Sequence, residues 1–162
     1  MKNAKAYEAK VKKVIKKKKA VLDPVTDQRG WLPFLIHAIL LNEATEAQAT
    51  RAAASLRREF SDYNELRVAP FKDIVECLGN NFPKVRQKAA ELTTALAGVF
   101  GKAFAMNMDY AKEMKKREIR QHLREDLKLG EFSEALISCI CFGVHTIPVS
   151  DALLRAMRLN GL

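Results

Sequence analysis

The sequence is poor in residues that break helices and in residues that staple small secreted domains. It holds 7 glycines and 5 prolines, and its cysteines (Cys77, Cys139 and Cys141) are an odd number without the spacing of a disulfide framework. No apolar run is long enough to span a bilayer, and the lysine-rich start lacks the apolar segment of a secretory signal. We therefore expect a reducing, cytoplasmic setting and no membrane span.

What the sequence does contain is typical of a helical globular protein. Apolar residues make up 48% of the chain, which argues against disorder. Alanine, leucine, lysine, glutamate and arginine dominate, and these residues favour helices. At 162 residues the length fits one domain with a hydrophobic core. The composition therefore predicts an all-α fold without strands.

The positive charge is concentrated at one end. Residues 1–19 hold nine lysines and one glutamate, which accounts for most of the net charge of +9. Such a block attracts polyanions, with nucleic acid as the first candidate and an anionic membrane surface as the second. A solubilising arm is the alternative. Peripheral membrane attachment is weakly supported, because the apolar face of the arm is narrow and lacks Trp and Phe.

Three parts of the chain are expected. Residues 1–22 form a basic amphipathic helix, because Tyr7, Val11 and Ile15 recur at helical spacing. Residues 23–31 form a linker rich in turn-forming residues. Residues 32–162 form a domain of short helices joined by tight turns. The expected helices cover 34–41, 46–60 (capped by Thr45 with Gln48), 63–68, Pro70 to Gly79, Pro83 to Gly101, 107–124, 132–142 and 151–159 (capped by Ser150).

Four segments of this domain resemble the helix-hairpin-helix DNA glycosylase superfamily, of the endonuclease III kind. ILLNEATE at 39–46 is similar to the family's LLSAQATD, and RQKA at 86–89, with Leu92, is similar to R-x-K-A-x-x-I. LKLG at 127–130 stands where the hairpin L-P-G-V-G is expected, and FGVHTIPV at 142–149 is similar to F-G-x-P-x-I-x-V. Eleven residues separate Gly130 from Phe142, as in the family. The resemblance implies a compact bundle of short helices with a degenerate helix-hairpin-helix motif and double-stranded DNA as the ligand.

Both positions that carry the family's chemistry are altered. The lyase lysine, whose amine attacks the sugar and forms a Schiff base, is replaced by Phe132, which has no nucleophile. The catalytic aspartate, which opposes the charge developing on the sugar, is replaced by Ser150. Asp151 follows one residue later, about 100° around a helix. It takes over the role only if the loop shifts by one residue, and otherwise it favours the helix start as an acidic residue of the first turn.

The resemblance also implies a set of DNA contacts. Glu43 stands where a glutamine of the family enters the base stack near the flipped base, and a carboxylate there departs from the pattern. Gly130 keeps one hairpin glycine, whereas Lys128 takes the place of the other and offers charge instead of a close backbone approach. A solvent-facing turn lysine is the alternative for Lys128. The expected DNA-binding residues are Glu43, Arg86, Lys88, Lys116, Arg120, Lys128 and Gly130.

The remaining candidates have ordinary explanations. Cys139 and Cys141 point about 200° apart on a helix and have no second pair, so buried thiols are favoured over a metal site. His37 fits a core histidine, His122 an exposed one, and His145 a loop near the expected pocket. The sequence ends before the position of the family's iron–sulfur cysteines. We therefore expect no metal and no cofactor.

Two functions fit this sequence. One is a DNA-binding protein resembling a base-excision-repair glycosylase, with catalysis lost or reduced to base removal by Asp151 without strand nicking. The other is a helical protein-interaction scaffold that retains the fold without DNA repair activity. The first predicts a cytoplasmic protein, associated with the nucleoid in a bacterium or archaeon. The salt dependence of DNA binding distinguishes the two.

Overall fold

The structure is a computed structural model that describes residues 8–10, 12–13, 30–159 and 161. The chain folds into two compact units. We call Asp27–Pro148 the body, and Met1–Thr26 together with Val149–Leu162 the terminal unit. The predicted domain of residues 32–162 thus crosses the boundary between the two units. Most of the predicted linker lies outside the described residues.

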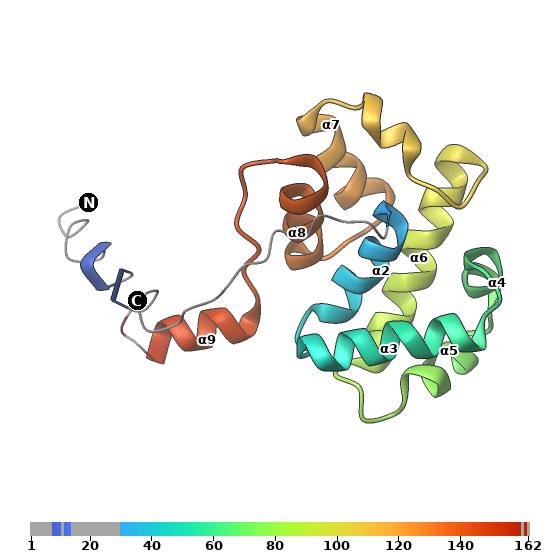
Figure 1. The fold of residues 1–162 in the computed structure, drawn as a ribbon, viewed down its shortest axis with the longest axis horizontal. Helices are drawn as coiled ribbons and strands as arrows, with labels where there is room; N and C mark the ends of the chain where they lie inside the picture. Colours follow the sequence, from blue (N-terminus) through green and yellow to red (C-terminus); the bar gives the residue numbers. More distant parts are fainter. Residues whose placement is uncertain (1–7, 11, 14–29, 160, 162) are drawn as a thin grey trace. The chain divides into compact units, whose positions relative to one another are not determined.

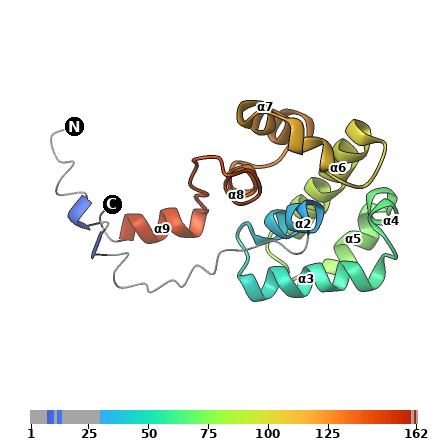
Figure 2. The same ribbon diagram turned by 45° about the horizontal axis from the view of Figure 1, so that its top comes forward.

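The described part of the chain is helical and holds no strand, which confirms the all-α expectation. The helices of the body are α2 (Trp31–Leu41), α3 (Glu46–Glu59), α4 (Tyr63–Val68), α5 (Phe71–Leu78), α6 (Val85–Ala103), η1 (Asp109–Glu113), α7 (Lys116–Gln121), η2 (His122–Asp126) and α8 (Glu131–Phe142). Helix α2 packs against α3, α6 and α8 (Figure 1). Both views place α5 beside α3 (Figure 2).

Local signals set several of these helix ends. At the start of α3, the Gln48 amide donates to the Thr45 hydroxyl at 3.3 Å, and the Thr45 amide donates to the Gln48 side chain at 2.9 Å. This reciprocal pair is the predicted capping box. Helix α5 begins after Pro70 and ends at Gly79, whose positive φ of 86° suits glycine. These predicted boundaries are confirmed to within a residue.

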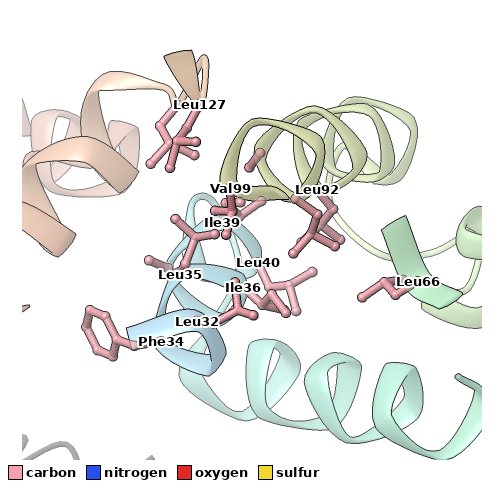
Figure 3. Close-up of a cluster of buried hydrophobic side chains, with 14 of the residues drawn as sticks. Leu32, Phe34, Leu35, Ile36, Ile39, Leu40, Leu66, Leu92, Val99 and Leu127 are labelled. Carbon is pink, nitrogen blue, oxygen red and sulfur yellow. The ribbon is translucent and has the colours of Figure 1, made fainter. Parts of the chain in front are cut away.

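The core of the body lies between α2 and α6. Leu35, Ile39 and Leu40 of α2 are fully buried, as are Leu92 and other apolar residues along one side of α6 (Figure 3). Burial of such side chains contributes about 1.5–3 kcal/mol each. Because α2 is apolar on nearly all sides, it lies in the interior with other helices around it.

Two predicted elements are corrected. Residues 107–124 form no single helix, because η1, α7 and η2 divide them. In η2 the Leu127 amide donates to the His122 carbonyl at 3.0 Å, a bond one residue longer than that of an α-helix. The predicted helix from Pro83 to Gly101 instead runs from Val85 to Ala103.

The terminal unit contains α9 (Asp151–Leu159). The Leu153 amide donates to the Ser150 hydroxyl at 3.2 Å, so Ser150 caps this helix as predicted. The described residues of the N-terminal arm are helical, and the Lys10 ammonium donates to the Gly161 carbonyl at 3.3 Å. Tyr7, Val11 and Ile15 lie outside the described residues. Among the described helices, none has the length and apolar character that crossing a membrane requires.

Candidate nucleic-acid interface

The turn between η2 and α8 carries the residues that the sequence compared with the family's hairpin. Lys128 has a φ of 55°, in the left-handed region that favours glycine. Gly130 follows in an extended conformation as the N-cap of α8. The turn therefore combines a left-handed backbone with an exposed lysine, at the position that the sequence compared with the first hairpin glycine.

The backbone amide that such a turn offers to a phosphate already has a partner. The Gly130 amide donates to Glu91 Oε1, 39 residues away on α6, at 3.1 Å. The other carboxylate oxygen, Glu91 Oε2, lies 3.6 Å from the Lys88 ammonium. A carboxylate of the chain itself thus occupies the position at which an anion would meet this amide.

Lys88 departs from the expectation of a DNA contact. Its side chain is 1% exposed, so its ammonium offers almost no surface to a ligand. The ammonium nitrogen has no hydrogen-bond partner in the described structure and is paired with Glu91 by charge. Burial lowers the pKa of Lys88, and the negative charge of Glu91 partly opposes this effect. Lys88 therefore holds Glu91 beneath the turn.

Glu43 is engaged in a similar way. It has a φ of 63°, and its carboxylate forms an ion pair with Lys84, which precedes α6 and is also left-handed, with a φ of 49°. The side chain of Glu43 is about one-fifth exposed, at 19%. Arg86 is exposed in the first turn of α6. Glu43 is thus directed toward Lys84, and Arg86 remains open to solvent.

A group of four cations surrounds a hollow of about 510 Å³ beside α7 and η2. Its rim carries Lys116, Arg117, Arg120 and Arg124, together with Gln121, Glu125 and Val144. The Lys116 ammonium donates to the Gly143 carbonyl at 2.7 Å, which ties the start of α7 to the end of α8. We call this the basic hollow. It includes Lys116 and Arg120, both of which the sequence singled out.

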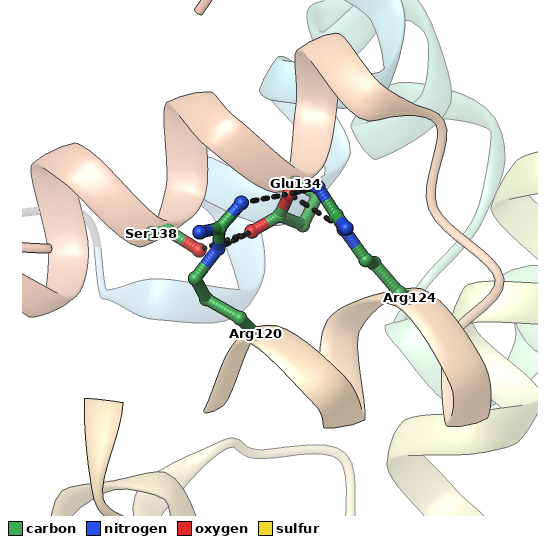
Figure 4. A network of polar contacts seen from close by, with 4 residues as sticks. All are labelled: Arg120, Arg124, Glu134 and Ser138. Carbon is green, nitrogen blue, oxygen red and sulfur yellow. Dashed lines mark hydrogen bonds and ion pairs between the residues drawn. The ribbon is translucent and has the colours of Figure 1, made fainter. Parts of the chain in front are cut away.

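A buried carboxylate orders two of these arginines. Glu134 of α8 is 0% exposed and accepts from Arg120 Nε at 2.9 Å and from Arg124 Nε at 2.9 Å (Figure 4). The Ser138 hydroxyl, one turn along α8, donates to the same carboxylate at 3.0 Å. Burial raises the pKa of Glu134, but the hydrogen bonds from Arg120, Ser138 and Arg124 outweigh it, so the pKa is lowered overall. Glu134 is therefore ionised at neutral pH.

His122 is corrected from an exposed to a buried residue. Its ring nitrogens lie 2.8 Å from the Tyr110 hydroxyl and 2.6 Å from an Asp126 carboxylate oxygen. Burial, with a smaller contribution from Asp126, raises the pKa of Tyr110 to about 12. This chain of polar groups joins η2 to η1. His122 is buried within it, Asp126 is exposed at its end, and none of the three lines the basic hollow.

The three positions compared with the family's catalytic residues lie in different parts of the chain. Phe132 is half-buried in the first turn of α8, within the body. Ser150 and Asp151 belong to the terminal unit, where Ser150 caps α9 and Asp151 is exposed in its first turn. An acidic residue is favourable in a first turn, which accounts for Asp151 without a catalytic role.

Glu134 and Glu91 are the residues that the sequence did not reveal. One signal for Glu134 was present, because it is the only charged residue between Phe132 and Phe142 in an otherwise apolar helix. A carboxylate at such a position needs a cation, and Arg120 and Arg124 share one helical face nearby. For Glu91, the i,i+3 spacing from Lys88 indicated an ion pair, but nothing local pointed to the bond from Gly130, which lies 39 residues away.

The described residues contain no group of His, Cys, Asp and Glu that would hold a metal ion. Cys77, Cys139 and Cys141 are half-buried thiols without disulfides. Comparisons with models of known protein families and with curated proteins found no match to this chain.

Proposed function

We propose that this chain is a DNA-binding protein with a glycosylase-like helical body that contacts duplex DNA through its backbone phosphates. The observation that carries the proposal is the basic hollow, where four cations border one depression. Clustered Lys and Arg side chains are the usual means of holding phosphates. In the family that the sequence resembles, the segment before the hairpin lies where the DNA backbone runs.

The proposal includes loss or strong reduction of catalysis. Phe132 cannot form a Schiff base, and Ser150 brings no negative charge to oppose a cationic sugar. Base removal by Asp151 remains the one route that the residues leave open. Asp151→Asn would abolish base release by that route, and release that persists in the variant would exclude it. Such a protein would act in the cytoplasm, on the nucleoid of a bacterium or archaeon.

A protein-interaction scaffold is the second candidate, and two contacts favour it. The Gly130 amide is paired with Glu91, and Glu43 with Lys84, so two positions that the family uses on DNA have partners within the chain. A scaffold that no longer binds DNA would keep its basic arm as a solubilising segment. Its body alone would then have no measurable affinity for DNA.

The test separates the body from the arm. Fluorescence anisotropy of a labelled duplex, with the chain lacking residues 1–19, gives the affinity of the remainder as a function of salt. We expect affinity to fall by about a thousandfold between roughly 50 and 200 mM salt if six or more phosphates are contacted. A second duplex with a stable abasic-site analogue reports whether a lesion pocket survives.

A matched pair of variants locates the contact. Arg117→Glu reverses one charge at the basic hollow, and Arg51→Glu reverses the charge of an exposed residue on α3. Both change the net charge equally, so general attraction predicts equal losses. We expect Arg117→Glu to weaken binding and flatten the salt dependence clearly more than Arg51→Glu. Equal effects, or no binding by the shortened chain, would favour the scaffold.

A further inference from the structure

Two hollows of the body adjoin at one residue. Val144 borders both the basic hollow and a second depression of about 460 Å³, lined by Cys139, Gly143, His145, Thr146 and Ile147. We call the second one the loop hollow. The hydrogen bond from Lys116 to the Gly143 carbonyl joins their rims. A ligand with one charged end and one less polar end would extend from one hollow into the other.

The charge of the basic hollow suits a single multiply charged group. Lys116, Arg117, Arg120 and Arg124 face one depression, and only Glu125 on the rim and Glu134 beneath it oppose them. Two positive charges therefore remain in excess. A phosphomonoester carries about −1.5 to −2 charges and three acceptor oxygens, whereas each internal phosphate of a duplex carries one charge and is one of a long series.

The two buttressed arginines are arranged to bind such a group. A guanidinium has five N–H donors, and Glu134 takes only part of those of Arg120 and Arg124. Their side chains are 38% and 52% exposed, so further donors lie at the surface. Because Glu134 is fully buried and bonded to Ser138, it holds both arginines in place before a ligand arrives.

The loop hollow suits the remainder of a nucleotide. Ile147 is 76% exposed and offers an apolar surface at the edge of this hollow. His145 and Thr146 beside it offer a ring for stacking and a hydroxyl for hydrogen bonding. A sugar and base attached to a phosphate in the basic hollow could therefore rest against Ile147.

We propose that the two hollows together bind the terminal nucleotide of a nucleic-acid strand, with its phosphomonoester in the basic hollow and its nucleoside in the loop hollow. This inference rests on the proposed function in taking nucleic acid as the ligand, and it adds a preference for phosphorylated ends. Glu134 is a positioning residue of the site, because it acts through Arg120 and Arg124.

The test compares labelled DNAs with the full chain at constant salt. One is a closed dumbbell duplex without ends. The others carry a short single-stranded overhang that ends in either a phosphate or a hydroxyl, prepared separately for 5′ and 3′ ends. We expect one phosphorylated end to bind about tenfold or more tightly than its hydroxyl counterpart, as one or two charged hydrogen bonds would give.

Three variants assign that preference to the site. Glu134→Gln should remove most of the preference for the phosphate, measured as the ratio of the affinities for the phosphate and hydroxyl ends, because Arg120 and Arg124 lose the carboxylate that holds them. Ile147→Ser changes the loop hollow and leaves the network around Glu134 intact. It should lower the affinity for the phosphorylated overhang severalfold. Ile140→Ser is its control, because Ile140 is exposed on α8 and lines neither hollow. Thermal unfolding of each variant confirms that it is folded.

The outcomes distinguish the two proposals. Equal binding of phosphate and hydroxyl ends would overturn this inference and leave the proposed function standing if the dumbbell binds. Binding of phosphorylated ends without the dumbbell would support this inference and count against contact with the duplex backbone. Adenosine 5′-monophosphate is the competitor. If it displaces the labelled strand with an affinity equal to that of the phosphorylated end, the site binds free nucleotides and the strand-end assignment is overturned.

Discussion

Lys128 combines a strained backbone with an exposed, charged side chain. Its backbone is left-handed, a conformation that costs a residue with a Cβ about 1–2 kcal/mol relative to the ordinary helical region. Its side chain is nevertheless exposed and charged, at a turn that the resemblance places against DNA. A lysine that only faces solvent would not offset the cost of this backbone strain, whereas a contact with a phosphate would. Stability and binding should therefore be measured together.

Lys128→Gly should separate these two properties. We expect the free energy of unfolding to rise by about 1 kcal/mol, because glycine adopts the left-handed conformation without strain. If Lys128 contacts a phosphate, the salt dependence of DNA binding should flatten by about 0.9 in logarithmic slope. Lys128→Ala is the control, since it loses the charge but keeps the strain. Urea unfolding and anisotropy measure both effects, and equal stability of the two variants would refute the strain.

Lys88 resembles a DNA-binding residue in the sequence, but in the structure it is buried in an ion pair with Glu91. Two charges with little exposure stabilise a protein only while both are present, because either one alone keeps its desolvation cost. Glu91 also accepts the Gly130 amide, so the pair fixes the turn to α6. The pair therefore has a structural role, and breaking it should destabilise the turn.

A double-mutant cycle tests that role. Lys88→Met alone and Glu91→Gln alone should each lower the free energy of unfolding by about 3 kcal/mol, because each leaves one charge unpaired. The double variant should lie close to wild type, since the glutamine oxygen can still accept the Gly130 amide. The measurement is urea unfolding of all four proteins. Additive losses would mean that the two charges are not coupled.

At the scale of elements, the approach of η2 to α6 depends on one missing side chain. A Cβ placed on Gly98 would lie 2.7 Å from a Leu127 methyl and 2.9 Å from the Asp126 carbonyl oxygen. The backbone of η2 therefore passes over α6 at a distance that only glycine permits. This contact carries the turn at Lys128 and Gly130, and with it the start of α8.

Gly98→Ala and Gly101→Ala should act in opposite directions. Both residues lie in α6, where alanine is favoured over glycine by about 1 kcal/mol. Nothing lies within 4 Å of a Cβ at Gly101, so that substitution should stabilise the protein by up to this amount. Gly98→Ala should instead destabilise it by about 1–3 kcal/mol through overpacking. The check is thermal unfolding, and a gain at both positions would disprove the close approach.

The elements that the sequence predicted are those with local causes. The capping box of Thr45 and Gln48, the proline and glycine at the ends of α5, and the Ser150 cap of α9 all act within a few residues. Residues 107–124 were predicted wrongly because distant contacts divide them. The bond between Tyr110 and His122 and the approach at Gly98 are absent from any local pattern.

The candidate site follows the same division. Its cations were visible in the sequence because Lys116, Arg120 and their neighbours form a basic run. The contacts of the carboxylates at this interface were not predicted, because Glu134 and Glu91 lie 14 and 39 residues from Arg120 and Gly130. Sequence patterns thus indicated which charges are present, and the fold determined which of them are exposed.

At the scale of the whole molecule, the positions of the family's chemistry fall in separate units. Phe132 begins α8 in the body, whereas Ser150 and Asp151 begin α9 in the terminal unit. Lyase chemistry needs a neutral amine at the sugar. Among the described residues, only Lys88 has a clearly lowered lysine pKa, and its side chain is buried beside Glu91. The proposed DNA binding by the body can therefore be tested separately from catalysis.

Borohydride trapping tests this separation. The amine of a lyase condenses with the C1′ aldehyde of an abasic site, releasing water, and borohydride reduces the resulting imine to a stable protein–DNA adduct. We expect wild type to bind an abasic duplex without forming an adduct or nicking the strand, because Phe132 has no amine. Phe132→Lys restores the amine at the family's position and should yield an adduct on a denaturing gel. An adduct with wild type that disappears in Lys88→Met would contradict us, because it would show that Lys88 leaves its buried pair and reaches the sugar.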